Sequence, residues 1–205
     1  FRDASKQTNI IVSAGANPFT LSGDHSISSA LLMEVSKAHG PVSLLQFDAH
    51  ADTGIGPKIQ HGAMFKIAAD AGTINPAKSI QIGLRTPFNS TLGFNTITAV
   101  EAMYQSSKIL SERIETVIGK SACYVSIDID CLDPSHAPGT GTPIPGGLTT
   151  LQLLEILRAL SGTKLNIVGL DLVEVAPDYD HAQITSLAAA QICQESLCLI
   201  SETKP

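Results

Sequence analysis

The sequence contains no tryptophan, and aromatic side chains account for only 4% of its 205 residues. Charged residues are also sparse, at 16%, and they form no long run of one sign. The formal net charge is −6, whereas nucleic acids and anionic membranes favour basic surfaces. No apolar stretch reaches the length that a bilayer requires. We therefore expect neither nucleic acid nor a membrane as a partner of this chain.

Cysteine is rare as well, with four residues that form no CxxC pair: Cys123, Cys131, Cys193 and Cys198. This pattern favours reduced thiols in a cytosol-like compartment over a disulfide framework. The first residues, Phe1-Arg2-Asp3-Ala4, lack the apolar core of a secretory signal peptide. They also lack an initial methionine, so we expect the N-terminal part of the full-length protein to be missing. The expected location is cytoplasmic, or mitochondrial if the missing part carries a transit peptide.

Length and composition predict one domain over residues 1–205, because 43% hydrophobic residues can bury a sizeable core. Short apolar runs alternate with helix-like stretches. Nearly continuous apolar runs are typical of parallel strands that are buried on both faces. The expected strands are Pro18–Ser22, Val42–Phe47, Ile80–Leu84, Tyr124–Ile129 and Asn166–Val173. Two expected helices are Ser26–Lys37 and Thr185–Ile200. A third helix is expected to be capped by Thr149 or Thr150, because Leu153, Leu154, Leu157 and Leu160 follow at helical spacing. This alternation predicts an α/β fold.

Acidic residues and histidines gather where these apolar runs end. Asp48, His50 and Asp52 follow the second predicted strand at intervals of two residues, which puts all three on one side of an extended backbone. Asp128 and Asp130 repeat this spacing at the end of another predicted strand. His25 lies in Gly23-Asp24-His25-Ser26, which closes the first strand. Ligands of open α/β sheets bind at the carboxyl ends of strands, so these side chains are expected to form one site.

The charge of this cluster predicts metal binding. Four carboxylates in a partly dry site repel one another strongly unless cations offset them. Two divalent cations would offset the four negative charges and leave two imidazoles as neutral ligands. Mostly oxygen donors with one histidine per ion suit Mn(II), with Co(II), Ni(II) or Fe(II) also possible. No cysteine is a proposed ligand, and Cys131 is expected to point away from the site and to pack in the core.

Three segments together resemble the signatures of the ureohydrolase (arginase/agmatinase) superfamily. They are Ser22-Gly23-Asp24-His25-Ser26, residues 47–53 (FDAHADT) and residues 126–134 (SIDIDCLDP). The resemblance extends through residues 137–143 (APGTGTP), 146–149 (GGLT), 169–177 (GLDLVEVAP) and Tyr179-Asp180. It implies a three-layer α/β/α fold with a mostly parallel central sheet and a metal site at the carboxyl ends of its strands.

Within this superfamily, the residues His61-Gly62-Ala63-Met64-Phe65 and the APGTGTP run look like those of agmatinases. The resemblance implies cleavage of agmatine to putrescine and urea by a hydroxide that bridges two Mn(II) ions. Guanidinobutyrase, another guanidino-acid amidinohydrolase or arginase is the alternative activity. A homo-oligomer, either a trimer or a hexamer, is also implied.

The resemblance further implies a role for each site residue. His25, Asp48, Asp52 and Asp128 would hold one manganese ion, and His50, Asp48, Asp128 and Asp130 would hold the other, with Asp48 and Asp128 bridging. Three residues would act in catalysis. Asp52 would orient the nucleophile, Glu174 would face the guanidinium of the substrate, and His61 would pass a proton to the leaving amine.

Departures from the family pattern leave two rival readings open. Ser22 replaces the first glycine of the usual Gly-Gly-Asp-His, the loop Thr53–Gln60 is short, and family members are longer at the N-terminus. One rival is therefore a non-catalytic truncated homologue. The other is a calcineurin-like phosphoesterase, although the Gly-Asn-His block of those enzymes is absent.

Arg85, after the third strand, holds either a loop or an interface carboxylate, and the sequence does not decide between them.

Overall fold

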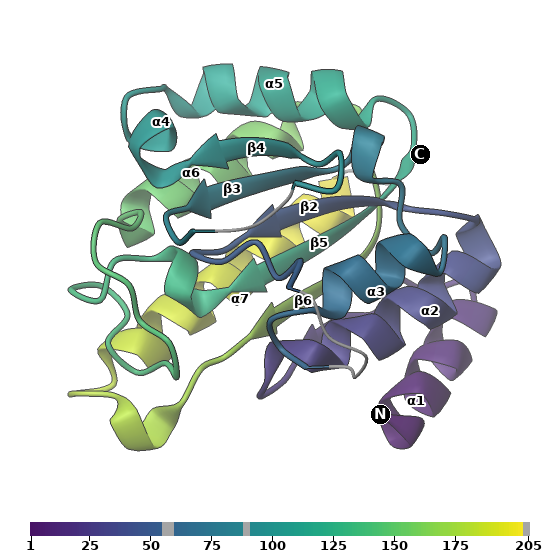
Figure 1. The fold of residues 1–205 in the computed structure, drawn as a ribbon, viewed down its shortest axis with the longest axis horizontal. Helices are drawn as coiled ribbons and strands as arrows, with labels where there is room; N and C mark the ends of the chain where they lie inside the picture. Colours follow the sequence, from purple (N-terminus) through teal and green to yellow (C-terminus); the bar gives the residue numbers. More distant parts are fainter. Residues whose placement is uncertain (55–59, 88–90, 203–205) are drawn as a thin grey trace.

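The computed structural model describes residues 1–54, 60–87 and 91–202 (Figure 1). Within these residues, six parallel strands form one sheet in the order β1-β6-β5-β2-β3-β4. The strands are β1 Phe19–Leu21, β2 Ser43–Phe47, β3 Ile80–Leu84, β4 Asn95–Thr98, β5 Ala122–Asp128 and β6 Asn166–Val173. The helices are α1 Arg2–Ser13, α2 Ser28–His39, α3 Met64–Asp70, α4 Ala99–Met103, α5 Ser107–Ile118, α6 Thr150–Ser161 and α7 Ile184–Glu202. The predicted α/β fold with a mostly parallel sheet is confirmed.

Helices cover both faces of the sheet, and the alternation of side chains along each strand builds a core on each face (Figure 1). Leu44 of β2 and Tyr124 of β5 are buried in a cluster with residues of α2 and α3. Their neighbours Leu45 and Val125 point to the other face and are buried with residues of α5, α6 and α7. Burial on both faces explains why these strands read as continuous apolar runs.

The predicted elements agree closely with the structure where a strand or helix is strongly apolar. The strands Ile80–Leu84 and Asn166–Val173 have the predicted bounds, and the other three predicted strands differ by one or two residues at their ends. The helix predicted from Ser26 begins instead as a 3-10 turn, His25–Ile27, before α2. Thr149 caps α6 through a capping box with Gln152. The prediction did not include α1, α3, α4, α5 or β4.

Helix α7 corrects one expectation from the sequence. Its 19 residues are long and apolar enough to cross a membrane, by length and composition alone. The structure places this helix against α6 and β6, where Ala188, Ile192 and Leu199 contribute to the core. A core helix of a globular domain passes the same length and composition test, so α7 is here accounted for by packing on the sheet.

Candidate metal centre

The order of the strands brings the predicted site residues to one edge of the sheet. The four neighbouring strands β1, β6, β5 and β2 run in parallel, so their carboxyl ends lie side by side. Asp48 directly follows β2, and Asp128 ends β5. Glu174 directly follows β6, and His25 lies four residues after the end of β1. Residues far apart in sequence therefore meet because parallel strands share one edge.

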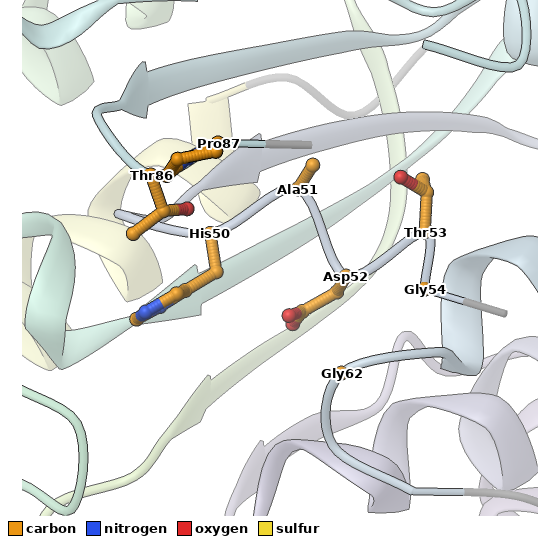
Figure 2. A pocket seen from close by; sticks show the side chains of 8 residues that line it. All are labelled: His50, Ala51, Asp52, Thr53, Gly54, Gly62, Thr86 and Pro87. Carbon is orange, nitrogen blue, oxygen red and sulfur yellow. The ribbon is translucent and has the colours of Figure 1, made fainter. Parts of the chain in front are cut away.

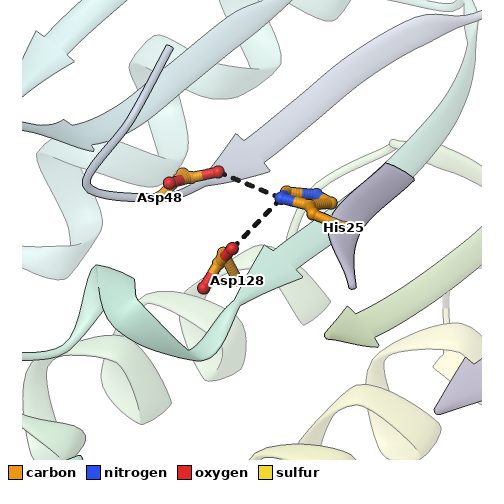
Figure 3. Close-up of side chains that lie close together, drawn as sticks. All are labelled: His25, Asp48 and Asp128. Carbon is orange, nitrogen blue, oxygen red and sulfur yellow. Dashed lines mark ion pairs between the residues drawn. The ribbon is translucent and has the colours of Figure 1, made fainter. Parts of the chain in front are cut away.

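His25 lies at the centre of a first group of possible metal ligands (Figure 3). Its Nδ1 atom is 3.3 Å from Oδ2 of Asp48, 3.1 Å from Oδ2 of Asp52 and 3.1 Å from Oδ2 of Asp128. Among the described residues, this buried nitrogen forms no hydrogen bond, because it is aimed between the three oxygens. Donors that bind one cation in perpendicular directions at about 2.1 Å lie about 3 Å apart. The spacing of these four atoms therefore fits a divalent cation.

His50 belongs to a second group with Asp48 and Asp130. Its Nδ1 atom is 3.0 Å from Oδ2 of Asp130 and 3.5 Å from Oδ1 of Asp48. Asp48 thus belongs to both groups, through different oxygens. Asp128 belongs to the first group only, so its bridging role stays a prediction. The structure brings together all six side chains that the sequence singled out as metal ligands.

The spacing of these residues predicted that they lie on extended backbone, but the chain is not extended throughout this segment. β2 ends at Phe47, and Asp52 has a φ of 51°, in the left-handed region. Figure 2 nevertheless shows His50 and Asp52 on one side of this segment and Ala51 and Thr53 on the other. The expectation that His50 and Asp52 share a side is correct, but bends in the chain produce it rather than a continued strand.

Asp130 likewise lies outside its strand. β5 ends at Asp128, and residues Ile129–Cys131 form a 3-10 turn. The Asp128 side chain caps this turn by accepting a hydrogen bond from the backbone N–H of Asp130 at 2.8 Å. The turn buries Cys131 in the core, as predicted, and all four cysteines are free thiols.

Charge accumulation perturbs the protonation of His25, His50 and Asp52 in this cluster. Burial alone would lower the pKa of His25, but the carboxylates of Asp128, Asp48 and Asp52 outweigh it and raise this pKa well above its ordinary value. The Asp130 and Asp48 carboxylates raise the pKa of His50 to about 10. Burial and the neighbouring Asp48 charge raise the pKa of Asp52 to about 7. Without a metal, the cluster therefore holds protons that partly offset its negative charge.

A bound cation must displace these protons, and this gives a pH prediction. Because the pKa of His50 is raised to about 10, its proton is present throughout the neutral range and competes with the metal there. We expect the affinity for Mn(II) to rise from about pH 6 to about pH 9, by about tenfold per pH unit for each displaced proton. Calorimetric titration in buffers with different ionisation enthalpies counts the released protons. A pH-independent affinity would contradict this competition.

A row of buried polar side chains crosses the sheet one layer below the ligands. Gln81, Gln46, Ser126 and Asp171 are register partners on the neighbouring strands β3, β2, β5 and β6, and each is fully buried. Gln81 donates to Gln46 at 2.5 Å, and Gln46 donates to Oδ2 of Asp48 at 2.6 Å. This row was not predicted from the sequence. Polar residues inside otherwise apolar buried strands were the signal that could have revealed it.

One end of this row fixes the orientation of His25. Nε2 of His25 is 2.8 Å from the Ser126 hydroxyl, and this hydroxyl donates to Oδ1 of Asp171 at 2.6 Å. Because Ser126 has only one proton and gives it to Asp171, its oxygen accepts from Nε2–H. The lone pair of a neutral His25 ring then lies on Nδ1, which faces the three carboxylates. A divalent cation at that point would satisfy all four donor atoms at once in place of the protons, so the residues present fit a metal ion.

We expect Ser126→Ala to weaken metal binding through His25 about 10- to 100-fold, because the serine orients the imidazole without touching the metal. Asp171→Asn is expected to act in the same direction. The measurement is competition for Mn(II) against a chelator of known affinity. Ser43→Ala is the matched control, since Ser43 is also fully buried in the sheet and lies at the far end of β2 from the ligands. Equal affinities of Ser126→Ala and the native chain would contradict this role.

Glu174 and His61 lie beside the ligands rather than among them. Oε1 of Glu174 accepts a hydrogen bond from the backbone N–H of His25 at 2.7 Å and is 3.6 Å from Nδ1 of His61. Glu174 has a φ of 65°, a strained conformation that is commonest at functional sites. Both residues line a cavity of about 80 Å³ together with the ligands His25, His50, Asp52 and Asp128 and with Gly62 and Thr142. The three predicted catalytic residues thus share one small cavity with four of the six predicted metal ligands.

A second, larger cavity adjoins this one. It has a volume of about 250 Å³ and includes His50 and Asp52 in its wall (Figure 2). Its other lining residues are Ala51, Thr53, Gly54, Gly62, Thr86 and Pro87. Thr53 and Gly54 begin the predicted short loop Thr53–Gln60, of which residues 55–59 lie outside the described residues.

Comparisons with known proteins agree with this geometry. The sequence model described as the arginase family matches residues 1–198. The chain is 46% identical over 198 residues to an agmatinase of Chromobacterium violaceum. The aligned residues cover 95% of this chain and 61% of that protein. A crystal structure of a hypothetical agmatinase from Burkholderia thailandensis superimposes with a TM-score of 0.92 at 42% identity, covering 96% of this chain and 63% of that one. Proclavaminate amidino hydrolase from Streptomyces clavuligerus gives a TM-score of 0.90 at 36% identity, covering 98% and 69%.

The chain spans about three fifths of the length of the curated relatives that it matches. The matched part includes the whole edge of the sheet at which the six possible ligands, Glu174 and His61 converge.

Proposed function

Because the chain belongs to the arginase family, we propose that it is a two-metal hydrolase that cleaves the guanidino C–N bond of a small guanidino compound. The observation that carries this proposal is the convergence of two histidines and four aspartates on one edge of the sheet, around a cavity that Glu174 also lines. The substrate that we favour is agmatine, with putrescine and urea as products, since the curated relatives at 42% to 46% identity carry the name agmatinase.

The proposed cofactor is a pair of Mn(II) ions. His25, Asp48, Asp52 and Asp128 would hold one ion, and His50, Asp48, Asp128 and Asp130 the other. Oxygen-rich donor sets with one imidazole each suit Mn(II), and Co(II), Ni(II) or Fe(II) also accept such ligands. Two divalent cations held in this way would lower the pKa of a water molecule in the cleft, so that it can act as a nucleophile near neutral pH.

Three side chains would then orient the water, bind the guanidinium and transfer a proton. Asp52, at the wall of both cavities, would accept a hydrogen bond from the attacking water and orient it toward the guanidinium carbon. Glu174 would pair with the guanidinium N–H groups, because a carboxylate matches that planar donor set. His61, with 53% of its side chain exposed and 3.6 Å from Glu174, would give a proton to the departing amine, which is a very poor leaving group without one.

A guanidino acid is the second candidate substrate. The observation that favours it is the likeness to proclavaminate amidino hydrolase, at 36% identity over 98% of this chain. The two candidates differ at the end remote from the guanidinium, where agmatine carries an amine and a guanidino acid carries a carboxylate. Both share the head group that Glu174 would recognise, so the proposed chemistry is the same for either substrate.

Metal analysis followed by urea release tests the proposal. The chain is loaded with Mn(II) and supplied in turn with agmatine, arginine and guanidino acids. We expect two ions per chain, urea release that is fastest from agmatine, and loss of this activity after removal of the metal by a chelator. Two bound ions without hydrolysis of any guanidine would favour the non-catalytic rival instead. Hydrolysis of a chromogenic phosphate ester would favour the phosphoesterase rival.

The trimeric or hexameric state implied by the resemblance and the cytoplasmic or mitochondrial location expected from the sequence are also proposals. Sedimentation equilibrium of the purified protein measures the first, and localisation of a tagged full-length protein measures the second.

A further inference from the structure

The guanidinium of Arg85 is surrounded by backbone carbonyl groups of the segment that carries Asp130. Arg85 directly follows β3 and is half-buried. Its Nη2 atom donates to the carbonyl oxygens of Asp130 at 2.6 Å and Leu132 at 3.1 Å. Nη1 donates to the carbonyl of Cys131 at 3.3 Å. These are three consecutive carbonyls, so Arg85 holds the turn that presents the Asp130 side chain.

The same guanidinium also holds the loop that approaches Asp130 from outside. Nε and Nη2 of Arg85 donate to the carbonyl of Ile144 at 3.0 Å and 2.7 Å. Two residues before Ile144, the hydroxyl of Thr142 donates to Oδ2 of Asp130 at 3.2 Å. Gly147 leaves the room for this arrangement, since a Cβ atom there would lie 2.6 Å from Nη2 of Arg85. Within the described residues, Arg85 forms no ion pair with a carboxylate, and its charged guanidinium donates hydrogen bonds to backbone carbonyl oxygens instead.

The backbone of Arg85 reaches the segment that carries His50. Its N–H donates to the carbonyl of Ala49 at 3.0 Å, and the N–H of Ala49 donates to Oδ1 of Asp130 at 3.1 Å. Arg85 is therefore bonded to both segments of the second ligand group. None of its hydrogen bonds in the described part of the chain involves His25 or Asp52, which belong to the first group.

We propose that Arg85 is a positioning residue for one of the two metal sites. It fixes the turn that places the Asp130 carboxylate beside His50, so the second site depends on it and the first does not. This inference rests on the two-metal site proposed above. A rigid planar fork of five N–H donors can bind several carbonyls at once. A lysine at this position keeps the charge but offers one nitrogen, which cannot reach the same carbonyls together.

The test is Mn(II) titration of Arg85→Lys with electron paramagnetic resonance as the readout. We expect one ion to bind as in the native chain and the second to bind about 10- to 100-fold more weakly, as for other residues that support a ligand. At one equivalent of bound metal, the spectrum should change from that of a coupled pair to that of an isolated ion. Arg158→Lys is the matched control, because Arg158 of α6 is exposed and pairs with Glu195 of α7, and it should leave both sites unchanged.

The outcomes separate this inference from the proposed function. Equal weakening of both sites in Arg85→Lys, or of neither, overturns the positioning role, since a purely structural role would not select one site. If Arg85→Lys does not fold, judged by circular dichroism, Arg85→Gln is titrated in the same way, because its amide keeps two donors. A native chain that binds no second ion overturns the two-metal site itself, and this inference with it.

Discussion

Asp128→Asn is expected to remove bound metal and to lower urea release by at least about 10³-fold, a loss comparable to that of a key electrostatic group in other enzymes. In the structure, Oδ2 of Asp128 lies 3.1 Å from Nδ1 of His25, while Oδ1 accepts from the backbone N–H of Asp130. Asparagine keeps the second contact and the size of the side chain, so the turn should form. It removes one of four negative charges and directs an N–H group toward the metal position.

The number of ions that Asp128→Asn retains decides the role of this carboxylate. Loss of both ions is expected if Asp128 bridges them, as the family resemblance implies. Retention of one ion, at the group formed by Asp48, His50 and Asp130, would limit Asp128 to the His25 group. Undiminished urea release would contradict any role at the metal pair. Asp70→Asn is the control, because Asp70 is an exposed aspartate that pairs with Lys66 on α3.

The residues of this site could be predicted from the sequence because residues that directly follow neighbouring parallel strands lie at the same edge of the sheet. Asp48 and Asp128 follow apolar runs, and those runs became the adjacent strands β2 and β5 with Phe47 opposite Ile127. Once these strands pair, the two aspartates must meet, whatever the bends beyond them. The predicted ligands therefore converge even though Asp52 has a left-handed backbone conformation and Asp130 lies in a 3-10 turn.

The supporting residues were not predictable in the same way. The side-chain contacts of Asp171 with Ser126 and Tyr124, and of Arg85 with the Asp130 carbonyl, join residues that are 45 or more positions apart in the sequence. Only the pairing of β5 with β6, and of β3 with β2, places them near the site. Helix α1 escaped prediction for a different reason, since Thr8 is its one fully buried residue and most of its residues are polar, with apolar side chains only at Ala4, Ile10, Ile11 and Val12.

Glu174→Gln is expected to keep both metal ions and to lower kcat/KM about 10²- to 10⁴-fold. The carboxylate is 14% exposed, and its Oε1 accepts from the backbone N–H of His25 at 2.7 Å. Glutamine can make that same hydrogen bond through its amide oxygen, so the His25 segment should stay in position. What changes is Oε2, which becomes an N–H group and turns from an acceptor of guanidinium protons into a competing donor.

The size of the expected loss follows from the bonds that are removed. A hydrogen bond to a charged group contributes about 1.5 to 3 kcal/mol, and a bidentate pair with guanidinium has two of them. In Glu174→Gln the bond at Oε2 is lost, the bond at Oε1 loses its charge assistance, and the new amide N–H opposes a guanidinium N–H. Together these changes cost about 3 to 6 kcal/mol of binding in the transition state, which corresponds to about 10²- to 10⁴-fold in kcat/KM. Glu174→Ala should lose turnover as well, and it removes the hydrogen bond to His25 in addition.

Metal content and kinetics must be measured on the same preparations of these variants. We expect two Mn(II) ions per chain in Glu174→Gln and in Glu174→Ala, with urea release reduced in both. The matched control is Glu112→Gln, which removes an exposed carboxylate from α5 and should leave kcat/KM unchanged. If the Glu174 variants lose metal in proportion to activity, then Glu174 holds the His25 segment for the metal, and its proposed contact with the guanidinium is wrong.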